Sequence, residues 1–132
     1  MLDDVMERTE QSSKIQLDRE YTLLVGTYSD QSVLAHQPYA PTEGTGIHTT
    51  RMSKDGCVSE VTATEVLNPA VLIPHSNGKR LYAIVETIKS TGMVVQYDVG
   101  NDQALAAQGT YYASGKSTCY LALSPQKDAA IV

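Results

Sequence analysis

Residues 68–86, which read NPAVLIPHSNGKRLYAIVE, hold the pattern that decides the fold. An apolar run from Ala70 to Ile73 is followed by a polar turn at Asn77-Gly78, and a second apolar run extends from Leu81 to Val85. The pair Asn-Gly accepts the positive φ angles that tight hairpin turns require. The stretch therefore predicts two antiparallel strands joined by a short turn.

The same strand–turn–strand unit begins again near the end of the sequence. Residues 119–132 read CYLALSPQKDAAIV, in which an apolar run, a polar turn and the start of another apolar run follow one another. Aligning Ser76 with Pro125 gives an offset of 49 residues (125 − 76). A β-repeat of about 40–50 residues is the period of a propeller blade. Because the sequence stops inside the repeated strand, we expect an all-β chain that forms an incomplete propeller.

Further strands are indicated by alternating apolar residues, by β-branched and aromatic residues, and by turn signals. We expect them at residues 21–28, 46–53, 58–66, 70–75, 80–86, 92–99, 104–112 and 119–124. No sequence after residue 20 has sustained helical periodicity. This pattern predicts about two antiparallel four-stranded blades: residues 20–67 lack one strand, residues 68–114 are complete, and residues 115–132 begin the next blade. Residues 1–19 are expected to be a flexible or weakly helical extension, and residues 29–45 a long surface loop.

Composition narrows the class of protein. The chain has 132 residues and a formal net charge of −5, and its ten Lys and Arg residues are scattered. Nucleic-acid binding is disfavoured because that function needs a basic surface. No stretch approaches the roughly 20 apolar residues of a membrane span, and the acidic N-terminus is unlike a signal peptide. We expect a cytoplasmic protein in which Cys57 and Cys119 are free thiols.

Four segments, taken in order, resemble the lactonase family of seven-bladed β-propellers. They are Val25-Gly26-Thr27-Tyr28, Gly46-Ile47, the stretch from Asn68-Pro69 to Leu81-Tyr82-Ala83-Ile84-Val85-Glu86, and Thr118-Cys119-Tyr120-Leu121-Ala122-Leu123-Ser124-Pro125. That family includes a bacterial type of 6-phosphogluconolactonase and the fungal carboxymuconate cyclases. The resemblance implies the N-terminal part of a hydrolase that opens a sugar lactone such as 6-phosphogluconolactone, with no cofactor. Two alternatives stay open, a lactone-forming 3-carboxy-cis,cis-muconate cyclase and a truncated, non-catalytic propeller fragment.

The sequence departs from the family pattern at several positions. The family's His in the second blade is Tyr120 here, the Asn before its Glu is Val85, and the Pro before its Cys is Thr118. An Asp-Gly turn has become Gln126-Lys127-Asp128. If the family's His is catalytic, its exchange for Tyr argues against normal activity in this chain.

Glu86 and Tyr120 are the candidate site residues. Glu86 ends a predicted strand and matches the family's Glu, so it is the candidate catalytic residue, able to act as a general base or to orient a water molecule. The alternative is a strand-end carboxylate that pairs with solvent or Lys89. Tyr120 is the candidate substrate-binding residue, since it can donate a hydrogen bond but, with a usual pKa of about 10, is a poor base. The alternative is a half-buried strand residue.

The remaining motifs predict neither a metal site nor a phosphate-binding loop. His36 lies in a proline-flanked loop, His48 in an alternating strand and His75 beside a turn, and their spacing predicts no metal site. The run at residues 115–118 ends like a phosphate-binding loop, but Thr110 stands where that loop needs its first Gly. We expect a small lactone as the substrate, no nucleic-acid or membrane partner, and self-association through open sheet edges.

Overall fold

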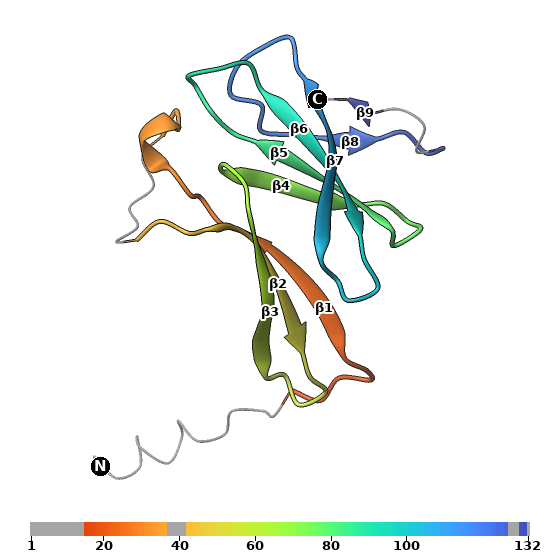
Figure 1. Ribbon diagram of the computed structural model, residues 1–132. Helices are drawn as coiled ribbons and strands as arrows, with labels where there is room; N and C mark the ends of the chain where they lie inside the picture. Colours follow the sequence, from red (N-terminus) through yellow and green to blue (C-terminus); the bar gives the residue numbers. More distant parts are fainter. Residues whose placement is uncertain (1–14, 37–41, 127–129, 132) are drawn as a thin grey trace, which may run out of the picture.

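The computed structural model describes residues 15–36, 42–126 and 130–131, and these residues form three antiparallel sheets (Figure 1). The first sheet has the order β1 (Tyr21–Gly26), β2 (Gly46–Met52), β3 (Val58–Glu65). The second has the order β4 (Pro69–Pro74), β5 (Arg80–Val85), β6 (Met93–Val99), β7 (Leu105–Tyr112). The third pairs β8 (Ala122–Leu123) with β9 (Ala130–Ile131). The all-β fold is confirmed, as a three-stranded blade, a complete four-stranded blade and the start of another.

The pairing register reproduces the repeat that the sequence indicates. Ile73 of β4 pairs with Tyr82 of β5, and 49 positions further along Ala122 of β8 pairs with Ile131 of β9. The first two sheets also share a β-bulge. In β2 it lies between Thr49 and Thr50, and in β6 it lies 47 positions later, between Gln96 and Tyr97. Thus β1–β3 repeat β5–β7, and the described residues contribute no counterpart of β4 to the first sheet.

The central strands β5 and β6 of the second sheet carry buried side chains on both faces, because successive side chains of a strand point to opposite faces of the sheet. On one face Leu81, Ala83 and Tyr97 pack against Ile47 of the first sheet. On the other face Ile84 and Val94 pack against Leu121, which lies just before β8. Each fully buried Leu or Ile contributes about 1.5–3 kcal/mol relative to an exposed one. Blade-to-blade packing of this kind is the main source of stability in the described part of the chain.

Two expectations need correction. The strand expected at 119–124 is reduced to Ala122–Leu123, so Cys119 and Tyr120 lie in the preceding connection. A positive φ of 53° at Ser117 interrupts extended structure there. The loop expected at 29–45 contains the 3₁₀ helix η2 (Gln31–Val33) and is not confined to the surface. Val33 and Leu34 are buried, which the absence of periodicity in this loop did not indicate.

The extension expected at residues 1–19 lies outside the described residues up to position 14. Residues 15–19 have no regular secondary structure, and the Leu17 N–H donates to the Lys54 carbonyl in the β2–β3 turn, with an N···O distance of 2.7 Å. Among the described residues, no helix is long and apolar enough to cross a bilayer.

Candidate functional site

Tyr28, His36 and Glu86 meet at one end of the first two blades. Glu86 follows β5 directly, and Tyr28 lies at the equivalent position after β1. The Tyr28 hydroxyl donates to Oε2 of Glu86 at 3.1 Å, and Nδ1 of His36 lies 3.8 Å from the other carboxylate oxygen, Oε1. The rings of Tyr28 and His36 pack edge to face, with centroids 5.8 Å apart. A repeated strand end and a loop residue therefore converge on one carboxylate.

Asn68 places the backbone around this carboxylate. Its side chain is fully buried, and its φ of 39° is one that Asn tolerates better than most residues. Oδ1 accepts hydrogen bonds from the amides of Ser29 and Asp30, both at 2.8 Å. Nδ2 donates to the carbonyls of Asp30 and Glu86 at 2.7 and 3.3 Å. One side chain thus ties the start of the 27–45 loop to the end of β5.

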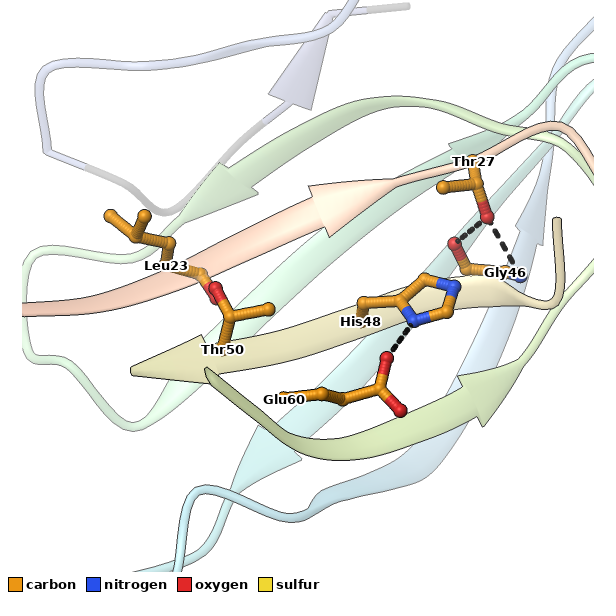
Figure 2. A network of polar contacts seen from close by, with 6 residues as sticks. All are labelled: Leu23, Thr27, Gly46, His48, Thr50 and Glu60. Atoms are coloured by element: carbon orange, nitrogen blue, oxygen red, sulfur yellow. Dashed lines mark hydrogen bonds and ion pairs between the residues drawn. The ribbon is translucent and has the colours of Figure 1, made fainter. Parts of the chain in front are cut away.

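The two ends of that loop are joined at its base. The Thr27 hydroxyl donates to the Gly46 carbonyl at 2.9 Å and accepts from the Gly46 amide at 3.2 Å, as Figure 2 shows. The Thr27 amide also donates to the Gly46 carbonyl at 2.8 Å. In Figure 1 the loop projects from the ends of β1 and β2. These hydrogen bonds fix the position of both ends of the loop relative to β1 and β2.

The loop is also anchored on its far side. The Ile88 amide donates to the Val33 carbonyl at 2.8 Å, which joins η2 to the segment that follows Glu86. Buried Leu34 and Val33 lie two and three positions before His36 in the chain. Apolar burial therefore holds the part of the loop from which His36 reaches the carboxylate.

Burial and charge both act on Tyr28. Desolvation, followed by the neighbouring Glu86 carboxylate, raises the pKa of Tyr28 above its usual value of 10.0. The phenol therefore stays protonated at neutral pH and remains a hydrogen-bond donor to Glu86. Cys57 and Cys119 are both free and exposed.

The structure treats the two candidate site residues differently. Glu86 lies at the centre of the cluster and is only 6% exposed, so it is not a solvated strand end. Tyr120 is 70% exposed and makes no hydrogen bond with Glu86, Tyr28 or His36. Tyr120 precedes β8, whose pairing with β9 repeats that of β4 with β5, so it lies at the same end of the blades as Glu86. There its side chain is exposed to solvent rather than enclosed by the cluster.

The remaining histidines lie elsewhere. His75 is a turn residue, as expected, and its Nδ1 accepts from the Asn77 amide at 3.2 Å. His48 of β2 pairs with Glu60 of β3 on the first sheet (Figure 2). No cluster of three metal-ligating side chains occurs within residues 15–36, 42–126 and 130–131.

Sequence reasoning missed Tyr28 and His36 as site residues. Tyr28 could have been found by aligning the end of the first strand with the end of the strand before Glu86, since the two are equivalent in the repeat. His36 belongs to the connection between β1 and β2, which is much longer than the equivalent connection between β5 and β6 in the second blade. Repeat analysis therefore gives no signal for it.

Comparison with known proteins agrees with this architecture. The model of the family "Lactonase, 7-bladed beta-propeller" matches residues 22–132. A Bacteroides fragilis protein assigned as a 6-phosphogluconolactonase is 30% identical with a TM-score of 0.65, over 80% of this chain and 27% of that one. A Bacteroides uniformis protein with the same assignment is 25% identical with a TM-score of 0.66, over 80% and 28%.

A third solved structure shares the fold. The periplasmic gluconolactonase PpgL of Pseudomonas aeruginosa is 22% identical with a TM-score of 0.66, over 82% of this chain and 29% of that one. No curated protein matches the chain significantly. The chain therefore spans less than a third of the length of each of the three solved proteins.

Proposed function

The chain belongs to the lactonase family of seven-bladed β-propellers, and we propose that it is the N-terminal part of a hydrolase that opens a sugar lactone such as 6-phosphogluconolactone. The observation that carries this proposal is the shielded Glu86 carboxylate, which two aromatic side chains contact at one end of the blades. Two similar solved proteins with at least 25% identity are assigned as 6-phosphogluconolactonases, which supports this substrate class.

In the proposed reaction, a water molecule attacks the lactone carbonyl and the ring ester bond breaks. Glu86 supplies the negative charge that makes removal of a proton from this water favourable. Tyr120, exposed at the same end, is proposed to donate a hydrogen bond to a substrate hydroxyl or phosphate. Donors that stabilise the oxyanion, and cations that bind a phosphate, are proposed to come from blades outside these 132 residues.

In this proposal the 132-residue chain holds only part of the catalytic site, which can be tested. Since a propeller site forms where several blades converge, the 132-residue chain alone is expected to show no lactone hydrolysis above buffer. The protein as its gene encodes it is expected to hydrolyse 6-phosphogluconolactone. Glu86→Gln, which removes the charge and keeps the shape, is expected to lower kcat by about 10²–10⁴-fold.

The matched control is Glu65→Gln, which removes an exposed carboxylate at the end of β3 and should leave the rate unchanged. If the gene-encoded protein hydrolyses no lactone, or if Glu86→Gln retains full activity, the proposal is wrong. If the protein instead converts 3-carboxy-cis,cis-muconate to its lactone, the cyclase alternative holds. In that reaction a substrate carboxylate adds to a carbon–carbon double bond and a proton is delivered to the other carbon.

The proposed location is the cytoplasm, which suits the two free thiols. The proposed partners are the lactone substrate and, for the isolated chain, a second copy of itself, with no nucleic acid or membrane. In the described part of the chain β1 pairs with β2 alone, and an apolar groove of about 350 Å³ lies between β1 and β4. An unpaired edge beside apolar surface favours association.

Sedimentation of the 132-residue chain over a range of concentrations tests this association. Val25 of β1 is 45% exposed, and Val25→Lys places a charge on the open edge. This variant is expected to shift the chain toward monomer, whereas Ile88→Lys, an equal change at an exposed residue outside the strands, should not. A monomeric parent chain at all concentrations would contradict the proposed association.

A further inference from the structure

We propose that His36, and not Glu86 itself, takes the proton from the attacking water, and that Glu86 acts as a positioning residue behind it. This inference rests on the proposed lactonase function. It assigns the proton-accepting role to a residue on the long loop between β1 and β2, a segment that does not follow the blade repeat.

Accessibility separates the two groups. A general base must come within about 2.6–3.2 Å of the proton-bearing oxygen while the substrate is in place. The Glu86 side chain is only 8% exposed, and its two oxygens face Tyr28 and His36. The His36 side chain is 57% exposed. A water that is in contact with a lactone ring can therefore reach the imidazole, whereas the carboxylate is shielded by the two aromatic rings.

The orientation of the imidazole suits this role. Nδ1 of His36 faces the Glu86 carboxylate, so the ring proton is favoured on Nδ1 and Nε2 is left as an acceptor. The Nδ1···Oε1 separation of 3.8 Å is longer than a hydrogen bond. Contacts of this kind often tighten when substrate binds. The edge-to-face contact with Tyr28 limits rotation of the ring, and Glu86 stabilises the imidazolium that forms.

The step balances without a further reactant. Nε2 of His36 accepts a proton from water while the water oxygen forms a bond to the lactone carbonyl carbon, and the carbonyl π electrons move to oxygen. When the tetrahedral intermediate collapses, the ring C–O bond breaks and the leaving oxygen takes the proton from Nε2. One lactone and one water give one hydroxy acid, and His36 returns to its starting state.

The tautomer of His36 is measurable in the 132-residue chain without turnover. Nitrogen-15 NMR of the imidazole rings is expected to show His36 with its proton on Nδ1. His75 is the internal control, because its Nδ1 accepts from the Asn77 amide and its proton must lie on Nε2. Glu86→Leu should abolish the preference of His36 and leave that of His75 unchanged. A His36 proton on Nε2 in the parent chain would overturn the inference.

Kinetics of the gene-encoded protein test the role itself. His36→Ala is expected to lower kcat and kcat/KM together by about 10²–10⁴-fold, and added imidazole should restore part of the loss. His48→Ala removes the His–Glu pair of the first sheet and is the matched control, with activity unchanged. A structural role for His36 alone would give no rescue by imidazole.

The outcomes distinguish the two proposals. If His36→Ala keeps its rate while Glu86→Gln loses activity, the role of His36 is wrong and the lactonase function stands. A loss confined to KM, or a loss that imidazole does not restore, also overturns proton transfer through His36. If the parent protein opens no lactone, both proposals fail, and the NMR result still decides whether Glu86 orients His36.

Discussion

Replacement of Asn68 by Ala is expected to be strongly destabilising, because one buried side chain satisfies four backbone groups. In Asn68→Ala the amides of Ser29 and Asp30 and the carbonyls of Asp30 and Glu86 all lose their partner. A buried polar group left without a partner costs about 1–3 kcal/mol. Ser29 and Asp30 are only half-buried, so water can reach part of this network. We therefore take the lower value of about 1 kcal/mol for each of the four groups, which gives a loss of about 4 kcal/mol.

Backbone conformation adds a second contribution. Asn68 has a φ of 39°, and a left-handed conformation costs most residues about 1–2 kcal/mol. The expected loss for Asn68→Ala is therefore about 5–6 kcal/mol, comparable with the whole stability of a small domain. Asn68→Gly removes the same hydrogen bonds, but glycine adopts a positive φ without steric cost. It should therefore cost about 1–2 kcal/mol less than Asn68→Ala.

The measurement is urea unfolding of the gene-encoded protein, combined with hydrogen exchange at the Asp30 amide. Asp30 is expected to lose protection in both Asn68 variants. The control is Asn77→Ala in the exposed β4–β5 turn, which removes one hydrogen bond, from the Lys79 amide at 2.9 Å, and should cost about 1 kcal/mol or less. If Asn68→Ala matches Asn77→Ala in stability and leaves Asp30 protected, the reasoning from orphaned buried groups is refuted.

Two further predictions concern close packing and pH. A Cβ at Gly26 would meet the Pro69 carbonyl, so Gly26→Ala should cost about 1–3 kcal/mol in urea unfolding, whereas Gly109→Ala, with nothing within 4 Å, should change stability by about 0.5 kcal/mol or less. Because the pKa of Tyr28 is raised in the folded protein, its contribution to stability is complete below the unfolded pKa of about 10 and is lost as pH rises through the folded pKa. Stability measured across this range should therefore fall less steeply in Tyr28→Phe, and an unchanged slope would contradict the shift.

The strands could be predicted from local chemistry alone. In β5, Leu81, Ala83 and Val85 alternate with Tyr82 and Ile84, and Asn77-Gly78 marks the turn before them, so periodicity and turn residues agree. The connection before β8 shows the limit of this approach. Cys119 and Tyr120 have the composition of a strand, but Ser117 turns the chain and the residues that follow remain irregular.

Glu86 could be named from the sequence because it ends a repeated strand and matches a family motif. Its contact with His36 could not be predicted from the sequence, because 50 positions (86 − 36) separate the two residues and no periodicity relates them. Its low exposure, which depends on that contact, could not be predicted either. The alternative for Tyr120, a half-buried strand residue, is wrong because the strand does not extend to it and its side chain is exposed.

The sequence by itself determined the strand order, the 49-residue repeat, the hairpin turns and the family, because these follow from side-chain alternation and from backbone preferences that act over a few residues. Only the tertiary structure decided which groups surround the Glu86 carboxylate. That choice depends on how a non-repeating loop is held, through its closed base at Thr27 and Gly46, its buried Val33 and Leu34, and the Asn68 side chain. Contacts of this kind join distant residues, so their free energy is not encoded in any local pattern.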